Sequence, residues 1–253
     1  MSTHQSTEQS TQQTAIVTGA SRGFGRAIAT ALVARGDRVI GIARDGSGLA
    51  AVQAELGAAF TPVVGDATGE QLAEQLIRTH RPTLLVLNAG AVPHVAPVQE
   101  QSWESFSHSW EVDTRHAFAW IRAALREPLA PGSTVVAMSS GAALNGSPLS
   151  GGYASAKAGV RHLSGYGADE SQRAGLGIRF TALFPPLTPA GAVGAAGVAG
   201  YARRQGVDRE AFVAAMPAVL TAEQVARAVL EAAQDRDGAA EYRITADGAT
   251  PLD

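Results

Sequence analysis

Short apolar runs alternate along the chain with longer segments in which apolar side chains recur every three or four residues. Most of the runs are continuous, which is typical of strands with both faces buried. The segments between them have the period of helices that cover a sheet. This alternation predicts an α/β protein, a doubly wound parallel sheet of about seven strands with helices on both faces. The predicted strands are 14–18, 38–42, 59–64, 83–88, 133–138, 178–183 and 241–245, and the predicted helices are 24–35, 48–56, 69–79, 99–127 (long enough for two), 152–173 and 221–234.

No linker or change of composition divides the pattern, so we expect one domain over 14–253. The polar segment 1–13 lacks the apolar core of a signal peptide and is predicted to be a disordered tail. Segment 187–217 is too long for an ordinary connection and is a candidate for a mobile lid. Its glycines recur every third residue from 191 to 200, a spacing that we attribute to the Ala- and Gly-rich composition.

Composition narrows the classes of partner. The formal charge of −3 argues against nucleic acid and anionic membranes. No apolar run approaches the ~18 residues of a membrane span. The chain has no cysteine, which excludes disulfides and thiolate chemistry, and no metal site is predicted. A cytoplasmic location is the expectation.

The first predicted strand leads directly into TGASRGFGRAIATAL. Gly19 suits the tight turn that leaves the strand, and Gly23 lets the backbone approach a phosphate. Gly25 lets the following helix lie close to the sheet. The amino end of that helix then faces a pyrophosphate with free N–H groups. The loop predicts a dinucleotide site.

The residues after the second strand bear on which dinucleotide binds. NAD sites place a carboxylate on the ribose there, whereas this chain reads GIARDG, with Arg44 beyond the strand end. Arg44 and Arg22 could both bind a 2′-phosphate, which favours NADP. A small change of register would instead bring Asp45 to the ribose, and NAD stays open on that ground.

The chain has one lysine and nineteen arginines, and the lysine stands four residues after a tyrosine in GGYASAKAGV. On a helix Tyr153 and Lys157 share a face. A nearby ammonium stabilises the phenolate and lowers the pKa of the phenol, which suits Tyr153 to acid–base work. Ser140, at the carboxyl end of the fifth strand, could bind a substrate carbonyl beside that phenol, with Ser139 as the neighbouring alternative.

These motifs together resemble the short-chain dehydrogenase/reductase family. The matching pieces, from Thr14 to about Leu252, are TGASRGFG, the aspartate of VVGDAT, the NAG of LVLNAG, the SS of AMSS, YASAK and a C-terminal ADG. The resemblance implies a Rossmann fold with strand order 3-2-1-4-5-6-7. It also implies a proton donor or acceptor at Tyr153, a substrate-orienting serine at Ser140, and Lys157 on the nicotinamide ribose. The cofactor-binding residues that the motifs imply are Gly19, Ser21, Arg22, Gly23, Phe24, Gly25, Arg44, Asp66, Ala67, Asn88, Ala89, Gly90, Tyr153, Lys157, Pro185 and Thr188.

The chain departs from the family pattern at Asp113, where members usually carry an asparagine that holds a water connecting the lysine to solvent. A carboxylate only accepts hydrogen bonds, and it adds negative charge near Lys157. The hypothesis is that Asp113 keeps the water relay, belongs to the catalytic set and moves the activity profile to higher pH. The alternative is that it only caps or bends its helix.

A second departure follows the sixth strand, where Pro186 replaces the usual glycine, fixing φ and removing an N–H. Thr188 or the backbone near Leu187 could still contact the carboxamide. His94 is a weaker candidate for a substrate contact, and Trp110 and His116 are expected to be packing residues.

These features predict an NADP(H)-dependent oxidoreductase that interconverts a ketone or aldehyde and an alcohol of a small or medium organic substrate. Reduction is the expected direction if the cofactor is NADPH. Two alternatives stay open, a dehydratase, isomerase or cyclase on the same scaffold and an NADP-binding sensor without turnover. The resemblance also implies a homodimer or homotetramer, built here through helices near 108–127 and 152–173.

Overall fold

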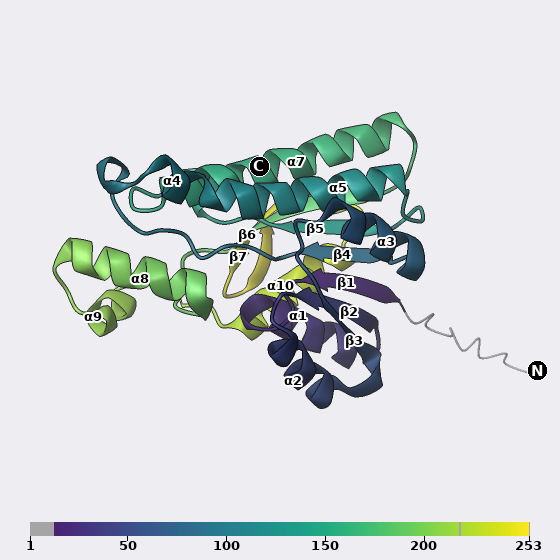
Figure 1. Ribbon diagram of the computed structural model, residues 1–253, viewed down its shortest axis with the longest axis horizontal. Coiled ribbons are helices and arrows are strands. Elements are labelled where there is room, and N and C mark those ends of the chain that lie inside the picture. Colours follow the sequence, from purple (N-terminus) through teal and green to yellow (C-terminus); the bar gives the residue numbers. More distant parts are fainter. Residues whose placement is uncertain (1–12, 218, 253) are drawn as a thin grey trace, which may run out of the picture.

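A computed structural model describes residues 13–217 and 219–252, so all of the predicted tail except Gln13 lies outside the described residues. Eight strands form one sheet in the order β3-β2-β1-β4-β5-β6-β7-β8, which confirms the α/β class and the implied order of the first seven (Figure 1). All neighbours are parallel except β7 and β8. The strands are β1 (Thr14–Thr18), β2 (Arg38–Ala43), β3 (Phe60–Val64), β4 (Leu84–Leu87), β5 (Thr134–Met138), β6 (Arg179–Phe184), β7 (Glu241–Thr245) and β8 (Gly248–Pro251).

The central strands are buried on both faces, as their continuous apolar runs predict. Ile16 of β1 lies between Ile40 of β2 and Leu85 of β4, and all three side chains are buried. Each of the seven predicted strands agrees with the structure to within one residue at either end. Apolar continuity is a strong signal when helices cover both sides of a parallel sheet.

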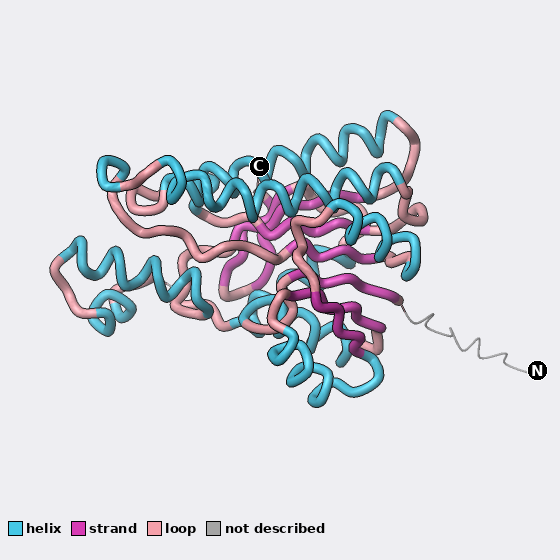
Figure 2. The backbone as a smooth tube through the Cα atoms, viewed as in Figure 1, coloured by secondary structure: helices cyan, strands magenta, loops and turns pink. Residues whose placement is uncertain are grey.

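Helices cover the two faces of this sheet (Figure 2). Helices α1, α2 and α10 build one apolar core with it, and α3, α5 and α7 build the other. The helices on each face also contact one another: α1 packs on α10, and α5 packs on both α3 and α7. The helices are α1 (Gly23–Ala34), α2 (Gly46–Leu56), α3 (Glu70–His80), α4 (Trp103–Ser109), α5 (Arg115–Arg126), α6 (Ala142–Asn145), α7 (Gly151–Arg173), α8 (Gly191–Gln205), α9 (Arg209–Ala214) and α10 (Ala222–Gln234), with 3-10 turns at Gly57–Ala59 and Val98–Glu100. None of the helices in these described residues is long and apolar enough to cross a membrane.

The predicted helix 99–127 is divided by a π-helical turn, Trp110–Thr114, between α4 and α5. A π-turn adds one residue to the hydrogen-bonded ring and re-aims the side chains within it. Asp113 lies inside this turn, and its side chain is fully buried.

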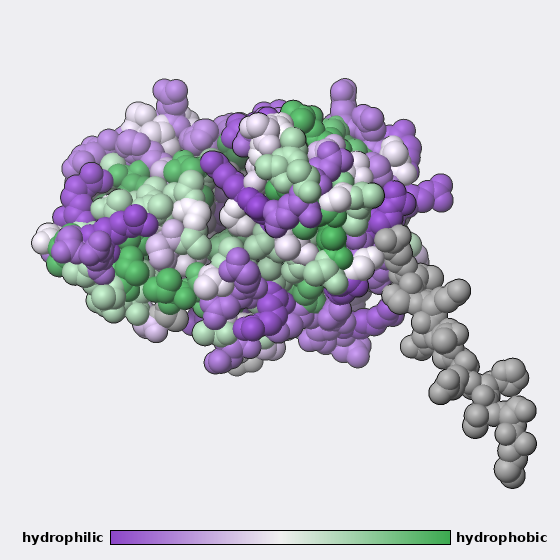
Figure 3. Space-filling view, turned by 90° about the horizontal axis from the view of Figure 1, so that it is seen from below, coloured by the Kyte–Doolittle hydropathy of each residue, from purple (hydrophilic) through white to green (hydrophobic). Residues whose placement is uncertain are grey.

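The predicted lid 187–217 contains two helices, α8 and α9, which project from the edge of the sheet (Figure 1). Seen from below, this end of the molecule, on the left of Figure 3, shows hydrophobic residues among hydrophilic ones. Two glycines of α8 have a structural cause that composition does not supply. A Cβ on Gly194 would come within 1.7 Å of the Thr188 carbonyl oxygen, and one on Gly200 within 2.3 Å of Val95. Gly194 and Gly200 therefore let α8 pack closely on neighbouring segments, whereas Gly197 meets only the end of the Leu187 side chain, and the attribution to composition stays a prediction for the spacing as a whole.

Strand β8 was not predicted. Its sequence, GATP, contains no apolar run, and it pairs antiparallel with β7 at the edge of the sheet. Pro251 is tolerated there because an edge strand leaves one row of N–H groups unpaired.

Candidate functional site

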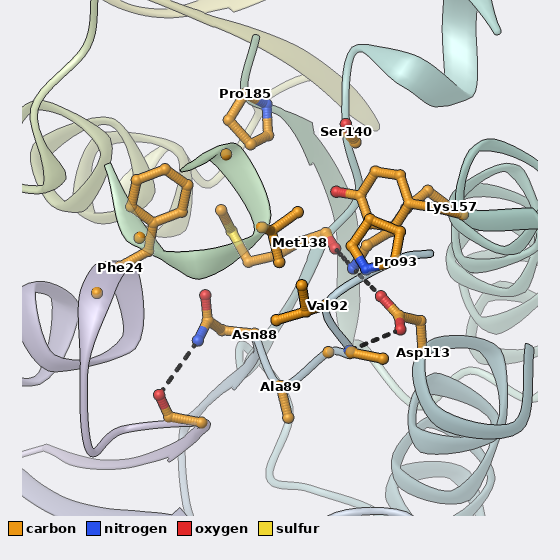
Figure 4. A pocket seen from close by; sticks show the side chains of 18 of the residues that line it. Phe24, Asn88, Ala89, Val92, Pro93, Asp113, Met138, Ser140, Lys157 and Pro185 are labelled. Atoms are coloured by element: carbon orange, nitrogen blue, oxygen red, sulfur yellow. Dashed lines mark hydrogen bonds and ion pairs between the residues drawn. The ribbon is translucent and has the colours of Figure 1, made fainter. Parts of the chain in front are cut away.

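One cavity of about 750 Å³ opens at the carboxyl ends of β1, β2, β4, β5 and β6 (Figure 4). This is where open parallel sheets bind ligands. It brings together all but one of the predicted catalytic and cofactor-binding residues. The exception, Gly25, is buried beneath the glycine loop and does not line the cavity. The predicted residues that line it are Gly19, Ser21, Arg22, Gly23, Phe24, Arg44, Asp66, Ala67, Asn88, Ala89, Gly90, Asp113, Ser140, Tyr153, Lys157, Pro185 and Thr188.

The glycine loop has the geometry that its sequence predicts. Gly19 has φ +69° and Gly23 has φ +54°, both in the left-handed region that disfavours other residues. A Cβ on Gly25 would lie 2.2 Å from the Gly19 carbonyl oxygen, so only glycine lets α1 begin so close to the turn. No side chain caps the amino end of α1, which leaves its N–H groups for a ligand.

Thr18 and Asn88 hold the two central strands together at the cavity floor. The Thr18 hydroxyl accepts hydrogen bonds from the backbone N–H groups of Asn88 (2.9 Å) and Ala89 (3.0 Å). The Asn88 amide in turn donates to the Thr18 carbonyl at 3.0 Å (Figure 4). Thr18 was not predicted, because a threonine at a strand end carries no distinctive sequence signal.

The acidic residues on the cavity rim are engaged in local turns. Asp66 accepts from the backbone N–H and the hydroxyl of Thr68, both at 2.9 Å, and these bonds hold the pKa of Asp66 below its ordinary value. Asp45 accepts from the Gly48 N–H and the Ser47 hydroxyl at the amino end of α2, and the same contacts lower the pKa of Asp45. Arg44 stays exposed on the cavity rim.

Tyr153 and Lys157 occupy successive turns of α7, with the Lys157 ammonium 5.8 Å from the centre of the phenol ring. The ammonium donates to the Met138 carbonyl at 3.0 Å and forms a 2.9 Å ion pair with Oδ1 of Asp113. The other carboxylate oxygen of Asp113 accepts from the Ala91 N–H at 2.9 Å, as drawn in Figure 4. Both oxygens of Asp113 are therefore held by the protein itself.

Gly90 explains how the carboxylate fits there. A Cβ on Gly90 would lie 2.7 Å from Oδ1 of Asp113. The absence of a side chain at Gly90 and the π-turn around Asp113 together allow the carboxylate to reach Lys157.

Burial and charge oppose each other at the phenol. Burial raises the pKa of Tyr153; Lys157 and a hydrogen bond with Ser140 lower it; Asp113 raises it, and the net direction is upward. For Lys157, burial alone lowers the pKa, but Asp113 and Tyr153 outweigh burial and raise the pKa above its ordinary value. Lys157 thus remains a cation and Tyr153 keeps its proton at neutral pH.

The two serines after β5 have different surroundings. The Ser139 hydroxyl is buried and donates to the Lys157 backbone carbonyl at 2.8 Å. The Ser140 hydroxyl accepts from the Ala142 N–H at 3.2 Å, which leaves its own proton for the Tyr153 hydroxyl or for a ligand in the cavity. The geometry favours Ser140 over Ser139 as the serine beside the phenol.

The residues after β6 line the cavity, but their polar groups are already engaged. The Thr188 hydroxyl donates to the Leu220 carbonyl at 2.6 Å, which fixes the base of the lid. The Pro185 carbonyl accepts from the Gly141 N–H at 2.9 Å, and Pro186 also lines the cavity. His94 is exposed and does not line the cavity, whereas its neighbours Val92 and Pro93 do.

Other lining residues carry chemistry that sequence reasoning missed. Ser147, Ser150 and Tyr201 place three hydroxyl groups in the wall, and Arg243 of β7 adds a guanidinium. Ser147 and Tyr201 stand 54 positions apart, so only the fold shows that they meet. Among residues 13–217 and 219–252, no group of acidic or histidine side chains could hold a metal ion.

His116, expected to be a packing residue, is buried behind Thr18. Its Nε2 lies 3.0 Å from the Thr18 hydroxyl, whose two lone pairs already accept from Asn88 and Ala89. The hydroxyl proton can go to the imidazole or to the Val86 carbonyl, 3.3 Å away, but an imidazolium N–H would find no free lone pair on this hydroxyl. Burial, with the nearby charge of Lys157, lowers the pKa of His116 to about 3.

His116 should therefore make the protein sensitive to acid. The pKa of His116 is about 3 in the folded protein and 6.5 ordinarily, so between these pH values the unfolded chain binds the extra proton. We expect stability to fall by up to about 1.4 kcal/mol per pH unit as the pH decreases below 6.5. Urea unfolding at several pH values should show a shallower decline for His116→Asn, and equal declines would contradict this assignment.

The shape and the polar groups of the cavity fit a dinucleotide. The loop with two left-handed glycines, the uncapped start of α1 and the cavity volume match a pyrophosphate and two nucleosides. Gly19, Gly23 and the first turn of α1 would hold the pyrophosphate, and Lys157 would hold the nicotinamide ribose.

Known proteins resemble this chain in sequence and in fold. The family model described as short chain dehydrogenase matches residues 13–197. An NADPH-dependent pterin aldehyde reductase of Arabidopsis thaliana is 30% identical over 153 residues, 57% of this chain and 63% of that protein, so the chain spans less than two thirds of the length of that relative.

Two crystal structures show the same fold. A short chain dehydrogenase/reductase from Burkholderia phymatum in complex with NAD has a TM-score of 0.76 at 24% identity, covering 91% of this chain and 88% of that chain. A 3-ketoacyl-(acyl-carrier-protein) reductase from Brucella melitensis complexed with NADH has a TM-score of 0.73 at 21% identity, covering 88% and 91%. With the family match over most of its length, the chain belongs to the short-chain dehydrogenases.

Proposed function

We propose that this protein is an NADP(H)-dependent oxidoreductase that interconverts ketones or aldehydes and alcohols, with residues 14–253 acting as one catalytic domain. The observation that carries the proposal is the placing of Tyr153, Lys157 and Ser140 in the same cavity as the glycine loop. A protein that only binds a nucleotide has no need of a serine beside a phenol. We therefore favour turnover over sensing.

The catalytic groups act on the substrate oxygen. Bound nicotinamide supplies the hydride for the substrate carbon or removes it. In reduction, the Ser140 hydroxyl donates a hydrogen bond to the carbonyl oxygen, and the Tyr153 hydroxyl gives it a proton as charge develops there. The resulting phenolate is stabilised by Lys157, whose ammonium is held by Asp113 and the Met138 carbonyl. Oxidation runs the same steps in reverse.

The raised pKa of Tyr153 bears on the direction of the reaction. A phenol that keeps its proton at neutral pH can donate it to a developing alkoxide, whereas oxidation needs the phenolate as base. Reduction should therefore be efficient at neutral pH, and oxidation should increase as the pH rises. Asp113 contributes to this bias because its charge opposes the effect of Lys157 on the phenol.

The arginines at the adenosine end support NADP over NAD. Arg22 and Arg44 are exposed on the cavity wall, and the carboxylate of Asp45 is engaged with α2. The NADPH-dependent reductase among the relatives agrees with this preference. The two similar crystal structures contain NADH and NAD, so the preference rests on Arg22 and Arg44.

Replacing Arg44 should change the choice of cofactor. A charge-assisted hydrogen bond contributes ~1.5–3 kcal/mol, so Arg44→Gln should lower kcat/KM for NADPH about ten- to a hundredfold and leave that for NADH within about twofold. The matched control is Arg236→Gln, which removes an exposed arginine outside the cavity. Equal losses with both cofactors would show that Arg44 does not bind a 2′-phosphate.

Substrate and cofactor tests separate the proposed reaction from its alternatives. The protein is mixed with NADPH and a panel of aldehydes and ketones, and both cofactor and product are followed. Consumption of NADPH with alcohol formation supports the proposal. Product without consumption supports a dehydratase, isomerase or cyclase, and binding alone supports a sensor.

The exposed face of α5 and α7 supports a homodimer or homotetramer. Trp110, Phe118 and Tyr166 surround an apolar hollow at Gly159, and these three aromatic residues are 43%, 45% and 61% exposed. Phe118→Asp should yield smaller particles by light scattering while the wild type is at least dimeric. A monomeric wild type, or a Phe118→Asp variant of unchanged mass, would show that this face is not a subunit interface.

A further inference from the structure

Three hydroxyl groups meet in the cavity wall and are explained by neither the dinucleotide nor the proton transfer. The Ser147 hydroxyl lies 2.7 Å from the Ser150 hydroxyl and 2.7 Å from the Tyr201 hydroxyl. Ser147 and Ser150 belong to the segment that leads into α7, and Tyr201 belongs to α8 of the lid. All three residues line the cavity. We name Ser147, Ser150 and Tyr201 the hydroxyl cluster.

The hydrogen-bond capacity of the hydroxyl cluster is not exhausted within the protein. Each hydroxyl has one proton to donate and two lone pairs. Two contacts join the three groups, and within the described residues their side-chain oxygens have no other hydrogen-bond partner. Two contacts use two protons, so one donor and several lone pairs remain for a further partner. Because the three hydroxyls carry no formal charge, a neutral oxygen suits the site. Such an oxygen can accept the remaining proton, and a hydroxyl could also donate to a free lone pair.

Packing around α8 directs the Tyr201 hydroxyl toward Ser147. The residue before Tyr201 in α8 is Gly200, where a Cβ would lie 2.3 Å from Val95, so the absence of a side chain lets the helix pack closely against that segment. The Tyr201 ring also stacks on Phe212 of α9, with ring centres 6.4 Å apart. Ala96 donates its N–H to the Leu149 carbonyl at 2.8 Å, which holds the serine segment from the other side. A preorganised group of this kind binds a ligand with little loss of conformational freedom.

The position of the cluster relates it to the reacting centre. Ser150 immediately precedes α7, and Tyr153 lies in the first turn of that helix, three residues on. Ser150 and Tyr153 also line the same cavity. A substrate whose carbonyl meets Tyr153 and Ser140 would therefore reach the cluster with a part several bonds away from that carbonyl.

We infer that the hydroxyl cluster binds a second neutral oxygen of the substrate, a hydroxyl or carbonyl group several bonds from the reacting carbonyl. The inference rests on the proposed function and names its substrate class, which is bifunctional oxygenated carbonyl compounds rather than simple alkyl ketones. Tyr201 and Ser147 are then specificity-determining residues. Neither takes part in proton transfer.

Acetonylacetone and methyl butyl ketone test this inference because both are six-carbon methyl ketones and only the first has a second carbonyl. Binding of each is measured by calorimetry to the protein saturated with oxidised dinucleotide, a mixture that cannot turn the ketone over. We expect acetonylacetone to bind about five- to tenfold more tightly, as one or two neutral hydrogen bonds allow. Equal affinities, or no binding of either ketone, would overturn the inference. Failure of the proposed reaction would appear separately, as absence of NADPH oxidation.

Variants then assign the preference to the cluster. Tyr201→Phe keeps the ring that stacks on Phe212 and removes only the hydroxyl, and Ser147→Ala removes the central group. Each should reduce the preference for acetonylacetone to about twofold or less while leaving affinity for methyl butyl ketone unchanged. The control, Tyr166→Phe, removes a phenol hydroxyl outside the cavity, keeps the apolar ring in the proposed subunit interface and should keep the preference. Equal weakening of both ketones in Tyr201→Phe would show a structural role only, and the inference would fail.

Discussion

Tyr153→Phe should abolish most of the turnover, lowering kcat for carbonyl reduction about a hundred- to ten-thousandfold, which is the usual contribution of a positioned general acid. The substitution removes one oxygen and leaves a ring of the same shape beside Lys157. Dinucleotide binding should persist, since the glycine loop and Asn88 are untouched. Steady-state rates and a fluorescence titration with NADPH measure the two effects on the same sample.

The matched control for this loss is Tyr166→Phe, which removes an equivalent hydroxyl from an exposed position of the same helix. It should retain full activity. A Tyr153→Phe enzyme with more than a tenth of the wild-type rate would mean that the proton comes from another group.

Removing the carboxylate of Asp113 should cost the protein about 3–5 kcal/mol of unfolding free energy, the usual effect of leaving one partner of a buried ion pair alone. Asp113→Ala strands the Lys157 ammonium, which is 7% exposed, and also frees the Ala91 N–H. Urea unfolding at neutral pH measures the loss. Glu170→Ala breaks the exposed pair with Arg173 and should cost no more than about 1 kcal/mol. Similar losses in the two variants would contradict the buried role of Asp113.

The amide variant separates the catalytic effect of Asp113 from its structural one. In Asp113→Asn an oxygen can still accept from Lys157, but the negative charge that raises the pKa of Tyr153 is gone. The pH–rate profile for alcohol oxidation should then move to lower pH, because the phenolate forms more readily. An unchanged pH–rate profile in a stable Asp113→Asn enzyme would mean that Asp113 has only a structural role.

The sequence hypothesis for Asp113 also included a water between its position and Lys157. In the structure the carboxylate contacts the ammonium directly at 2.9 Å, and its second oxygen accepts from Ala91. We propose instead that the Lys157–Asp113 ion pair sets the electrostatic effect on the pKa of Tyr153. A proton relay to solvent would then reach the Lys157 ammonium from a side that Asp113 does not occupy. The sign of the expected pH effect is the same in both accounts.

Strands and site motifs were predictable because each depends on local sequence. Burial on both faces gives β1 and β5 continuous apolar runs, and YASAK fixes Tyr153 and Lys157 one turn apart in any helix. The glycine loop is equally local, since Gly19 and Gly23 need left-handed φ angles wherever that turn forms.

The features that were missed depend on tertiary contacts. Helix α8 is rich in glycine, which disfavours helices, and it forms where Gly200 packs on Val95 and Tyr201 reaches Ser147. Strand β8 has no pattern of its own and depends on pairing with β7. The π-turn that re-aims Asp113 likewise has no reliable signature in sequence.

Transfer of hydrogen between the cofactor and the substrate tests the central claim most directly. NADPH that carries deuterium at both positions of the reactive nicotinamide carbon is incubated with the enzyme and a ketone that it accepts, and the product is examined by mass spectrometry. The account predicts one deuterium on the carbinol carbon for each NADPH oxidised, in water of ordinary isotopic composition. A product without deuterium, or one formed without oxidation of NADPH, would contradict it.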